Sequence, residues 1–294
     1  MKFLLNAIAG AALVSAASLS LAAGSIGGAI PAGGVLFSDD SAERWIDTNN
    51  NGILDVGDKL RGIFSIGNTA PPNVPLGAGT AYNELTGIFQ TVVTAAVNPV
   101  VIGGIPRFDY SFAADPAFAA EFGVAAGTVG MFFEDSAQNF ARQACGGLND
   151  FAACEATATG GTLWASFSIA GGLWKAASAA ANPDAGALLP LTTPLGTFGV
   201  GLDFIVNNTG YQWNKVQCSD PTNLFAPSIA VDFCGQGGIL ASGSGLAVNP
   251  TPTPYAIFDN VDFTANRVPE PASIALVGLA LLGLGATSRR RIKK

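Results

Sequence analysis

The stretch Thr162-Leu-Trp-Ala-Ser-Phe-Ser-Ile-Ala170 carries the clearest secondary-structure pattern in this chain. Its apolar residues at the odd positions 163 to 169 alternate with Trp164 and Ser166. A period of two is typical of a half-buried β-strand. Leu173–Ala179 has a similar composition, and we expect it to pair with the first stretch across a turn at Gly171-Gly172. The pattern predicts an antiparallel hairpin at this point.

Outward from this hairpin, the chain is a series of short apolar segments separated by Gly, Pro and Asn. Strands are predicted at residues 59–66, 84–96, 107–112, 128–133, 197–207, 227–233 and 257–265. This spacing favours a mainly β body, an antiparallel β-sandwich or jelly roll, with a few short helices. The helices are expected at residues 39–46, 115–123 and 136–144.

The helix at 115–123 has the clearest boundaries. Asp115 is its expected N-cap, Pro116 occupies the first helical position, and Gly123 ends it. By contrast, residues 68–80 contain three prolines and are expected to form a long loop or linker.

The first 23 residues have the composition of an export signal. Lys2 is followed by the apolar or small stretch Phe3–Leu21, and Ser20-Leu21-Ala22 or Leu21-Ala22-Ala23 suits a cleavage site with small residues. We therefore expect residues 1–23 to be a signal helix handled by the Sec export machinery. The exported body is expected to be residues 24–266.

The C-terminus combines three features in a fixed order. Arg267 precedes Val268-Pro269-Glu270-Pro271, the uncharged run Ala272–Ala286 follows, and a basic tail closes the chain. The tail contains Arg289, Arg290, Arg291, Lys293 and Lys294. A helix of 15 residues is about 22 Å long, against a hydrocarbon core of about 30 Å, which suits a transient inner-membrane span with a cytoplasmic basic end.

Residues 267–294 resemble the PEP-CTERM sorting domain of exosortase substrates in Gram-negative, biofilm-forming bacteria. The resemblance rests on Val268, Pro269, Glu270 and Pro271, the apolar run, and Arg289, Arg290 and Arg291. It implies cleavage near the Pro-Glu-Pro motif by an exosortase-type enzyme, and delivery to the cell surface or extracellular matrix. The alternative is an ordinary C-terminal membrane anchor, in which Glu270 has no role.

Charge narrows the classes of partner. Without Lys2 and the five cations of the tail, 8 of the 14 Lys and Arg residues remain. All 21 Asp and Glu residues lie between these two groups, so this part of the chain carries a net charge of −13. Such a surface repels nucleic acid and is compatible with divalent cations and secretion.

Four cysteines, Cys145, Cys154, Cys218 and Cys234, are expected to form two disulfides in an oxidising compartment. Three connectivities are open, and the short-range pairs Cys145–Cys154 and Cys218–Cys234 are the ones that we predict. A structural zinc site is the competing interpretation. It has little support, because the chain has no His and its cysteines lack CxxC spacing.

Residues 47–58, the Asp47 loop, have the spacing of a calcium loop. Oxygen side chains occupy its positions 1, 3, 5, 9 and 12, Gly52 stands at position 6, and a backbone carbonyl is expected to contribute at position 7. The expected calcium ligands are Asp47, Asn49, Asn51, Ile53, Asp55 and Asp58. The alternative is a plain Asn-Gly hairpin turn, since the segment that follows resembles a strand rather than a helix.

Catalytic signatures are scarce. With no His, the sequence lacks the common nucleophilic triads and most catalytic zinc sites. Glu134, Asp135 and Asp203 are the remaining candidates for carboxylate chemistry, although solvated strand ends are their ordinary role. Trp164 and Trp174 would serve as a glycan-binding platform if exposed, whereas burial in the core is the alternative.

Three functions follow, and none of them requires a cofactor other than calcium. The first is a non-enzymatic surface or matrix protein that contacts exopolysaccharide in biofilm or flocculation. The second is a secreted carbohydrate-binding module, and the third a secreted hydrolase.

Overall fold

The computed structural model describes residues 24–102, 105–140, 151–179, 194–223, 225–240 and 257–269. Residues 1–23, the expected signal helix, and residues 270–294, with the expected C-terminal helix, therefore lie outside the described residues. Within this part of the chain, no helix has the length and apolar character needed to cross a membrane.

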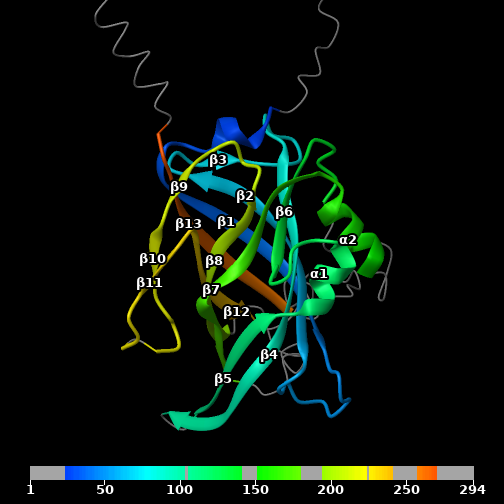
Figure 1. The fold of residues 1–294 in the computed structure, drawn as a ribbon, viewed down its shortest axis with the longest axis vertical. Helices are drawn as coiled ribbons and strands as arrows, with labels where there is room; N and C mark the ends of the chain where they lie inside the picture. Colours follow the sequence, from blue (N-terminus) through cyan, green and yellow to red (C-terminus); the bar gives the residue numbers. More distant parts are fainter. Residues whose placement is uncertain are drawn as a thin grey trace, which may run out of the picture.

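The described chain is mainly β (Figure 1). Its strands are β1 (Gly33–Ile46), β2 (Lys59–Ala70), β3 (Val74–Pro75), β4 (Glu84–Ile102), β5 (Ile105–Ala114), β6 (Gly130–Asp135), β7 (Thr162–Ser178), β8 (Pro194–Asn207), β9 (Trp213–Asn214), β10 (Val216–Cys218), β11 (Ile229–Val231), β12 (Phe233–Leu240) and β13 (Ile257–Arg267). Its helices are the 3-10 helix η1 (Ile26–Ala29) and the α-helices α1 (Pro116–Phe122) and α2 (Phe151–Thr159).

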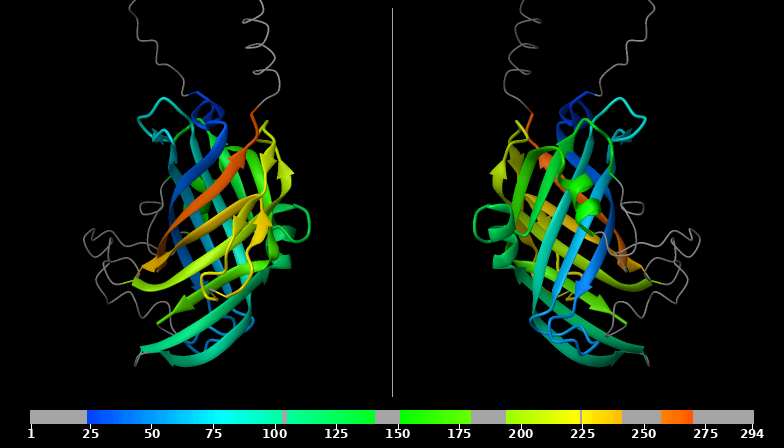
Figure 2. Two further views of the ribbon diagram at one scale, coloured as in Figure 1. Left: turned by 90° about the vertical axis from the view of Figure 1, so that its left-hand side faces the viewer. Right: turned by 90° about the vertical axis from the view of Figure 1, so that its right-hand side faces the viewer.

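The main sheet closes on itself. Antiparallel pairing runs in the order β2-β1-β13-β12-β8-β7-β5-β4, and β4 pairs back onto β2 from Leu85↔Ile66 to Val92↔Lys59. These eight strands form a barrel-like body, seen from two sides in Figure 2. The expected sandwich or jelly roll is therefore corrected, because both edges of the sheet are paired and a second facing sheet is not needed to bury it.

Strands β5 and β6 share the gap between β4 and β7 at different heights. β6 pairs with the first half of β4 and with β7, up to Gly130↔Phe167. β5 pairs with the second half of β4 and with the end of β7, from Phe108↔Ser178. The long strands β4 and β7 are therefore connected through β6 in one half of the barrel wall and through β5 in the other.

Aromatic rings fill the interior. Phe132 lies among them, with ring centroids 4.6 Å from Phe64 and 5.0 Å from Phe167. Phe233 contacts Phe37 at 5.3 Å and Trp213 at 5.2 Å. Such buried rings supply much of the apolar area that stabilises a domain of this size.

A second apolar cluster lies outside the barrel wall, under α1 and α2. Ile63, Ile88 and Met131 face outward from β2, β4 and β6 and pack against Phe118 of α1 and Ala158 of α2. Figure 2 shows the two helices against this one side of the barrel. These strands are therefore buried on both faces where the helices cover them.

Two local predictions are wrong. Residues 39–46 are not a helix but the second half of β1. The glycines at 171 and 172 do not turn the chain, because β7 continues through them, and their φ values of 54° and 70° accompany a register shift between Ile169 and Trp174. Glycine accepts this left-handed backbone, so the strand bulges instead of reversing.

The helix with the clearest sequence boundaries is confirmed. α1 begins at Pro116, the Asp115 side chain accepts a hydrogen bond from the Ala117 N–H, and Gly123 has a φ of 62° at the C-terminal cap. Residues 136–140 are not helical, and the rest of that expected helix lies outside the described residues. The loop expected at 68–80 is shorter, since β2 extends to Ala70 and β3 follows.

Candidate functional site

The inner face of β1 carries a polar stripe, formed by Asp39, Ser41 and Glu43, within an otherwise apolar interior. Val35 and Phe37 precede it on the same face, so the strand places every second side chain inside the barrel. The three stripe residues are 7%, 1% and 6% exposed. A buried carboxylate is costly unless it is partnered, so this stripe is unusual for a core strand.

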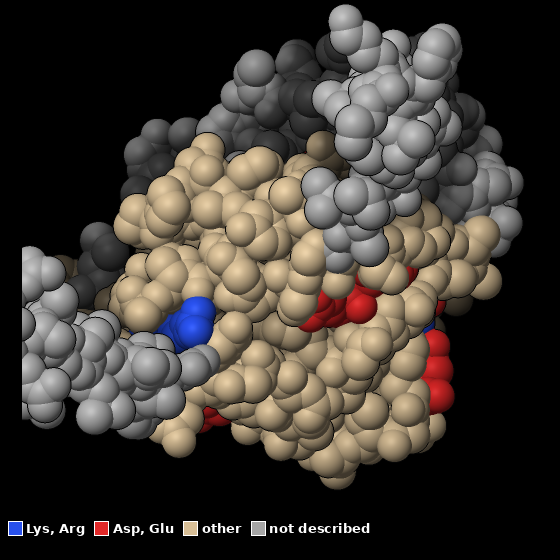
Figure 3. All heavy atoms as spheres, turned by 90° about the horizontal axis from the view of Figure 1, so that it is seen from above, with Lys and Arg blue, Asp and Glu red and all other residues tan. Residues whose placement is uncertain are grey.

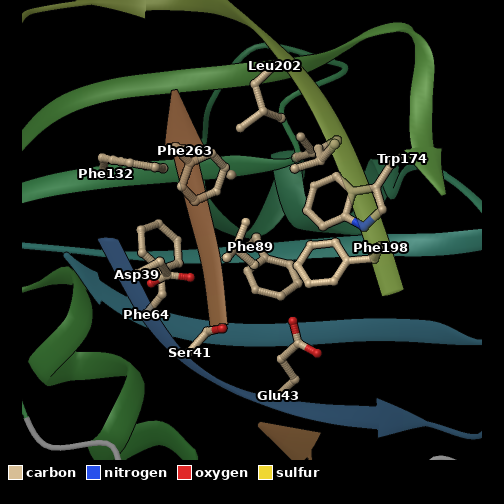
Figure 4. Close-up of a pocket in the computed structure, with 14 residues that line it drawn as sticks. Asp39, Ser41, Glu43, Phe64, Phe89, Phe132, Trp174, Phe198, Leu202 and Phe263 are labelled. Carbon is tan, nitrogen blue, oxygen red and sulfur yellow. The ribbon is translucent and has the colours of Figure 1, made fainter. Parts of the chain in front are cut away.

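The β1 stripe forms one wall of a cavity of about 30 Å³, close to the space of one water molecule. In Figure 4 the Glu43 carboxylate points toward the rings of Phe89 and Phe198, and Asp39 lies beside Phe64. Trp174 and Phe263 also line the cavity. Polar groups and aromatic faces therefore meet inside the barrel.

This cavity was not predicted from the sequence. Val35, Phe37, Asp39, Ser41 and Glu43 occupy alternate positions in the sequence, but a helix was expected at residues 39–46. Treating the odd positions from 35 to 43 as one strand face would have found the stripe.

The Asp47 loop connects β1 and β2 at the end of the barrel away from both described termini (Figure 1). Asp47 accepts hydrogen bonds from the N–H groups of Asn49, Asn51 and Gly52. The Asn49 and Asn51 amides both donate to Asp55, at 3.0 Å and 2.6 Å. Four of the expected calcium ligands are thus brought together.

Asp58 has a different position. It is 0% exposed, and its carboxylate accepts from the Thr48 N–H and hydroxyl, both at 2.9 Å, the Trp45 indole N–H at 3.1 Å and the Asp55 N–H at 3.1 Å. Both carboxylate oxygens are therefore engaged by protein donors, and Asp58 fastens the loop to the barrel.

Donor chemistry at the loop fits calcium in part. Asp47, Asn49, Asn51 and Asp55 supply hard oxygen donors, the type that calcium prefers. However, among the residues that the structure describes, no three His, Cys, Asp or Glu side chains are grouped to hold a metal ion. Without Asp58, the side-chain donors are two carboxylates and two asparagine amides, and this set fits only a weak calcium site.

Replacement of Asp58 by alanine is expected to cost about 2–4 kcal/mol of unfolding free energy, because four donors lose a buried charged acceptor. Burial raises the pKa of Asp58. The hydrogen bonds from Thr48, Asp55 and Trp45 have the larger combined effect, so the pKa lies below its ordinary value. This stabilisation is therefore complete above the carboxyl's unfolded pKa, about 3.9, and is lost as pH falls through the lower folded pKa.

Urea unfolding of the wild type and of Asp58→Ala at pH 7 and pH 3 measures the loss of unfolding free energy at each pH. Asp40→Asn is the control, because Asp40 is exposed. If the difference in unfolding free energy between the wild type and Asp58→Ala is as large at pH 3 as at pH 7, the role of the charged carboxylate is contradicted.

The two tryptophans considered as a glycan-binding platform are both buried. Trp164 is 4% and Trp174 is 7% exposed, and both belong to the interior cluster. Neither ring face is available at the surface, which corresponds to the core-packing alternative.

The acids considered for hydrolysis all have local partners. Glu134 accepts from the Ile26 N–H at 2.9 Å and from the Asn83 amide at 2.8 Å. Asp135 accepts from the Ala137 N–H at 2.7 Å, and Asp203 pairs with Lys215 at 2.7 Å.

One acid that sequence reasoning missed stands opposite Asp135. Glu84 is its register partner on β4, and Glu84 accepts from the N–H groups of Asn139 and Phe140. Burial raises the pKa of Glu84, and the Asp135 charge adds to that effect, while the two N–H groups oppose it. These bonds tie the segment after β6 to the barrel.

The disulfide Cys218–Cys234 is confirmed, with its Cα atoms 5.3 Å apart. It joins β10 to the start of β12. Cys154, on α2, is also disulfide-bonded, and Cys145 lies outside the described residues.

The end of β13 is held firmly against the N-terminal part of the body. The Arg267 guanidinium donates to the Ile30 carbonyl and lies 3.5 Å above the Tyr211 ring. The Val268 N–H donates to the Gln212 carbonyl at 2.8 Å. Beyond this point the predicted sorting residues 270–294 lie outside the described residues.

Residues 267–291 match the model of the PEP-CTERM protein-sorting motif. The motif implies an exported surface protein that is processed by exosortase. No curated protein and no solved structure matches the chain. This chain therefore carries a PEP-CTERM sorting domain directly after the last strand of its barrel.

Proposed function

We propose that the processed chain acts outside the cell as a non-enzymatic structural or interaction protein of an exopolysaccharide matrix, in biofilm or flocculation. The observation that carries this proposal is the junction at Arg267, where β13 ends and the sorting motif begins. Cleavage near Pro269 or Glu270 leaves every strand of the barrel in the mature protein.

The arrangement of the two ends supports display at a surface. The described chain begins at Gly24 and ends at Pro269, and both leave the same end of the barrel (Figure 2). The visible part of this end carries few charged side chains (Figure 3). The Asp47 loop and the β4–β5 hairpin lie at the opposite end (Figure 1), so that end is directed away from the membrane before processing.

Glu270→Ala is expected to block release of the mature form, because the motif residue that the processing enzyme recognises is lost. We expect at least a tenfold fall in surface-released protein, with unprocessed chain accumulating in the membrane fraction. Immunoblots of surface and membrane fractions measure both, and Asp40→Asn, on an exposed position of β1, is the control. Unchanged release in Glu270→Ala would contradict sorting through this motif.

A second candidate function is carbohydrate binding at the end of the barrel that carries the Asp47 loop. A groove of about 330 Å³ is lined there by Phe108 and Tyr110, with Asn49 and Asp55 nearby. Ile53, Val56 and Val97, which also line it, are 51%, 60% and 52% exposed. Apolar surface beside amide and carboxylate groups is suited to a sugar ring.

Affinity electrophoresis in gels containing the host polysaccharide tests this candidate. Val56→Asp should abolish retardation if the groove binds the glycan. Phe225→Ala, which truncates a ring that is 98% exposed outside the groove, should leave it unchanged. Equal retardation of wild type and Val56→Asp would exclude the groove.

We also propose that a calcium ion stabilises the Asp47 loop. Asp47, Asn49, Asn51 and Asp55, with the Ile53 carbonyl, would hold the ion, which would stiffen the loop beside the groove. Calorimetry is expected to show weak calcium binding that Asp47→Ala removes. Absence of calcium heat with the wild-type protein would contradict this proposal.

A further inference from the structure

Large apolar side chains are exposed at two places on the described surface. Among the described residues, those that are more than half exposed are Ile53, Val56, Val97 and Phe225. The first three line one groove, whereas Phe225 is 98% exposed and lies outside it. Apolar side chains that are grouped and bordered by polar residues mark interaction sites, unlike single scattered ones. The described surface therefore presents one apolar groove and one separate aromatic ring.

Phe225 belongs to the connection between β10 and β11, and hydrogen bonds hold this connection in place. Asp220 accepts from the Thr222 N–H at 2.8 Å and from its hydroxyl at 2.6 Å. Asn223 accepts from the Phe225 N–H at 3.2 Å. The Arg107 guanidinium, on β5, donates to the Thr222 carbonyl at 2.7 Å. The ring is therefore displayed by a braced loop, and such pre-organisation reduces the entropy that binding costs.

The groove has room for a phenylalanine ring. The Asp47 loop and the β4–β5 hairpin form it, and its apolar lining includes Ile53, Val56, Val97, Phe108 and Tyr110. Its volume is about 330 Å³, whereas a cavity of about 150 Å³ accepts benzene. β10 and β11 lie along one side of the barrel, and the groove-forming segments lie at its lower end (Figure 1). Because the β10–β11 connection is braced, a ring that fills this groove must come from another molecule.

We propose that Phe225 of one copy inserts into the groove of a second copy, so that the processed chains associate head to tail. A contact between two different surfaces repeats from copy to copy and gives open chains unless its rotation closes a ring. This inference rests on the proposed matrix role, for which it names a second copy of the chain as the partner.

The contact is expected to be weak for a single pair of molecules. One aromatic side chain buries about 150–250 Å², against about 1,200 Å² or more in a stable interface. Assembly therefore depends on a high local concentration at the cell surface and on the repetition of the contact. The ring of a second copy and a glycan cannot fill the groove together.

Sedimentation equilibrium of the surface-released protein, freed of polysaccharide, tests the association. We expect its weight-average mass to rise with concentration. Phe225→Ala and Val56→Asp should each weaken self-association at least tenfold, because burial of one large apolar side chain corresponds to about that factor or more. Phe225→Tyr should still associate, since the ring remains. The matched control for the new charge is Ala126→Asp, at an exposed position after α1, which should associate as the wild type does.

Mixing the two defective variants tests the head-to-tail geometry, with circular dichroism confirming that both fold. Phe225→Ala retains the groove and Val56→Asp retains the ring, so each alone should be monomeric. Their equimolar mixture should form dimers that grow no further. A wild-type protein that stays monomeric, a mixture no heavier than its components, or self-association that Phe225→Ala leaves unchanged would overturn the proposal. Surface release is measured separately with Glu270→Ala, so failure of self-association leaves the sorting of the protein to the surface intact.

Discussion

Phe132→Ala is expected to remove about 3–5 kcal/mol of the free energy of unfolding. Phe132 is 2% exposed, and its ring contacts those of Phe64, Phe167 and Phe263 at 4.6, 5.0 and 5.9 Å between centroids. Truncation removes the buried area of one ring and also the packing of the rings around it. Domains have only about 5–15 kcal/mol of stability, so the variant should be close to unfolding.

Chemical unfolding followed by Trp fluorescence measures this loss. Phe225→Ala is the control, because its ring is 98% exposed and surface substitutions change stability by no more than about 0.5 kcal/mol. The loss of unfolding free energy in Phe132→Leu should lie between those of Phe132→Ala and Phe225→Ala, since leucine retains part of the side-chain volume. A loss below about 1 kcal/mol in Phe132→Ala would contradict a close-packed aromatic interior.

Arg61→Ala is expected to cost a similar amount, about 3–5 kcal/mol. Arg61 is 3% exposed on the outer face of β2, and its guanidinium donates to Glu155 at 2.6 and 2.7 Å, to Glu121 at 2.8 Å and to Gln90 at 2.7 Å. Burial alone would lower the pKa of Arg61, but Glu155 and Glu121 raise it above its ordinary value, so it stays charged. Its removal leaves Glu155 on α2 with the longer ion pair to Arg44, at 3.5 Å.

The matched control for Arg61→Ala is Arg107→Ala. Arg107 pairs with Asp109 at 2.7 Å, but the two side chains are 30% and 35% exposed. Exposed pairs contribute about 0.2–1 kcal/mol. Arg61→Lys should recover only part of the loss, because an ammonium group has three N–H donors, whereas the Arg61 guanidinium donates five hydrogen bonds. Equal losses in the two alanine variants would contradict the buried role of Arg61.

The sequence predicted the strands better than their arrangement. Alternation and composition located β2, β4, β5, β6, β8 and β13, because these signals are local. Closure of the sheet depends on the pairing of β1 with β13, which joins residues as far apart as Gly33 and Arg267 and which no local pattern encodes. Gly171 and Gly172 suggested a turn because glycine suits both a turn and a bulge, and only the neighbouring strands decide between them.

The candidate sites were predicted unevenly. The sorting motif was found because its three parts are contiguous. The Asp47 loop was found as a segment, but the engagement of Asp58 by Trp45 and Thr48 depends on how the loop meets the barrel. The β1 stripe was missed, because polar residues on a core strand break the expected alternation and resemble a helix start.

The intact mass of the protein recovered from the cell surface tests the central claim, that a complete barrel is exported and then separated from its sorting tail. The account predicts a chain that starts near Ala23 or Gly24 and ends just beyond Arg267, with β13 retained. A surface form with the full precursor mass of 29.7 kDa, or one that ends before Arg267, would contradict it.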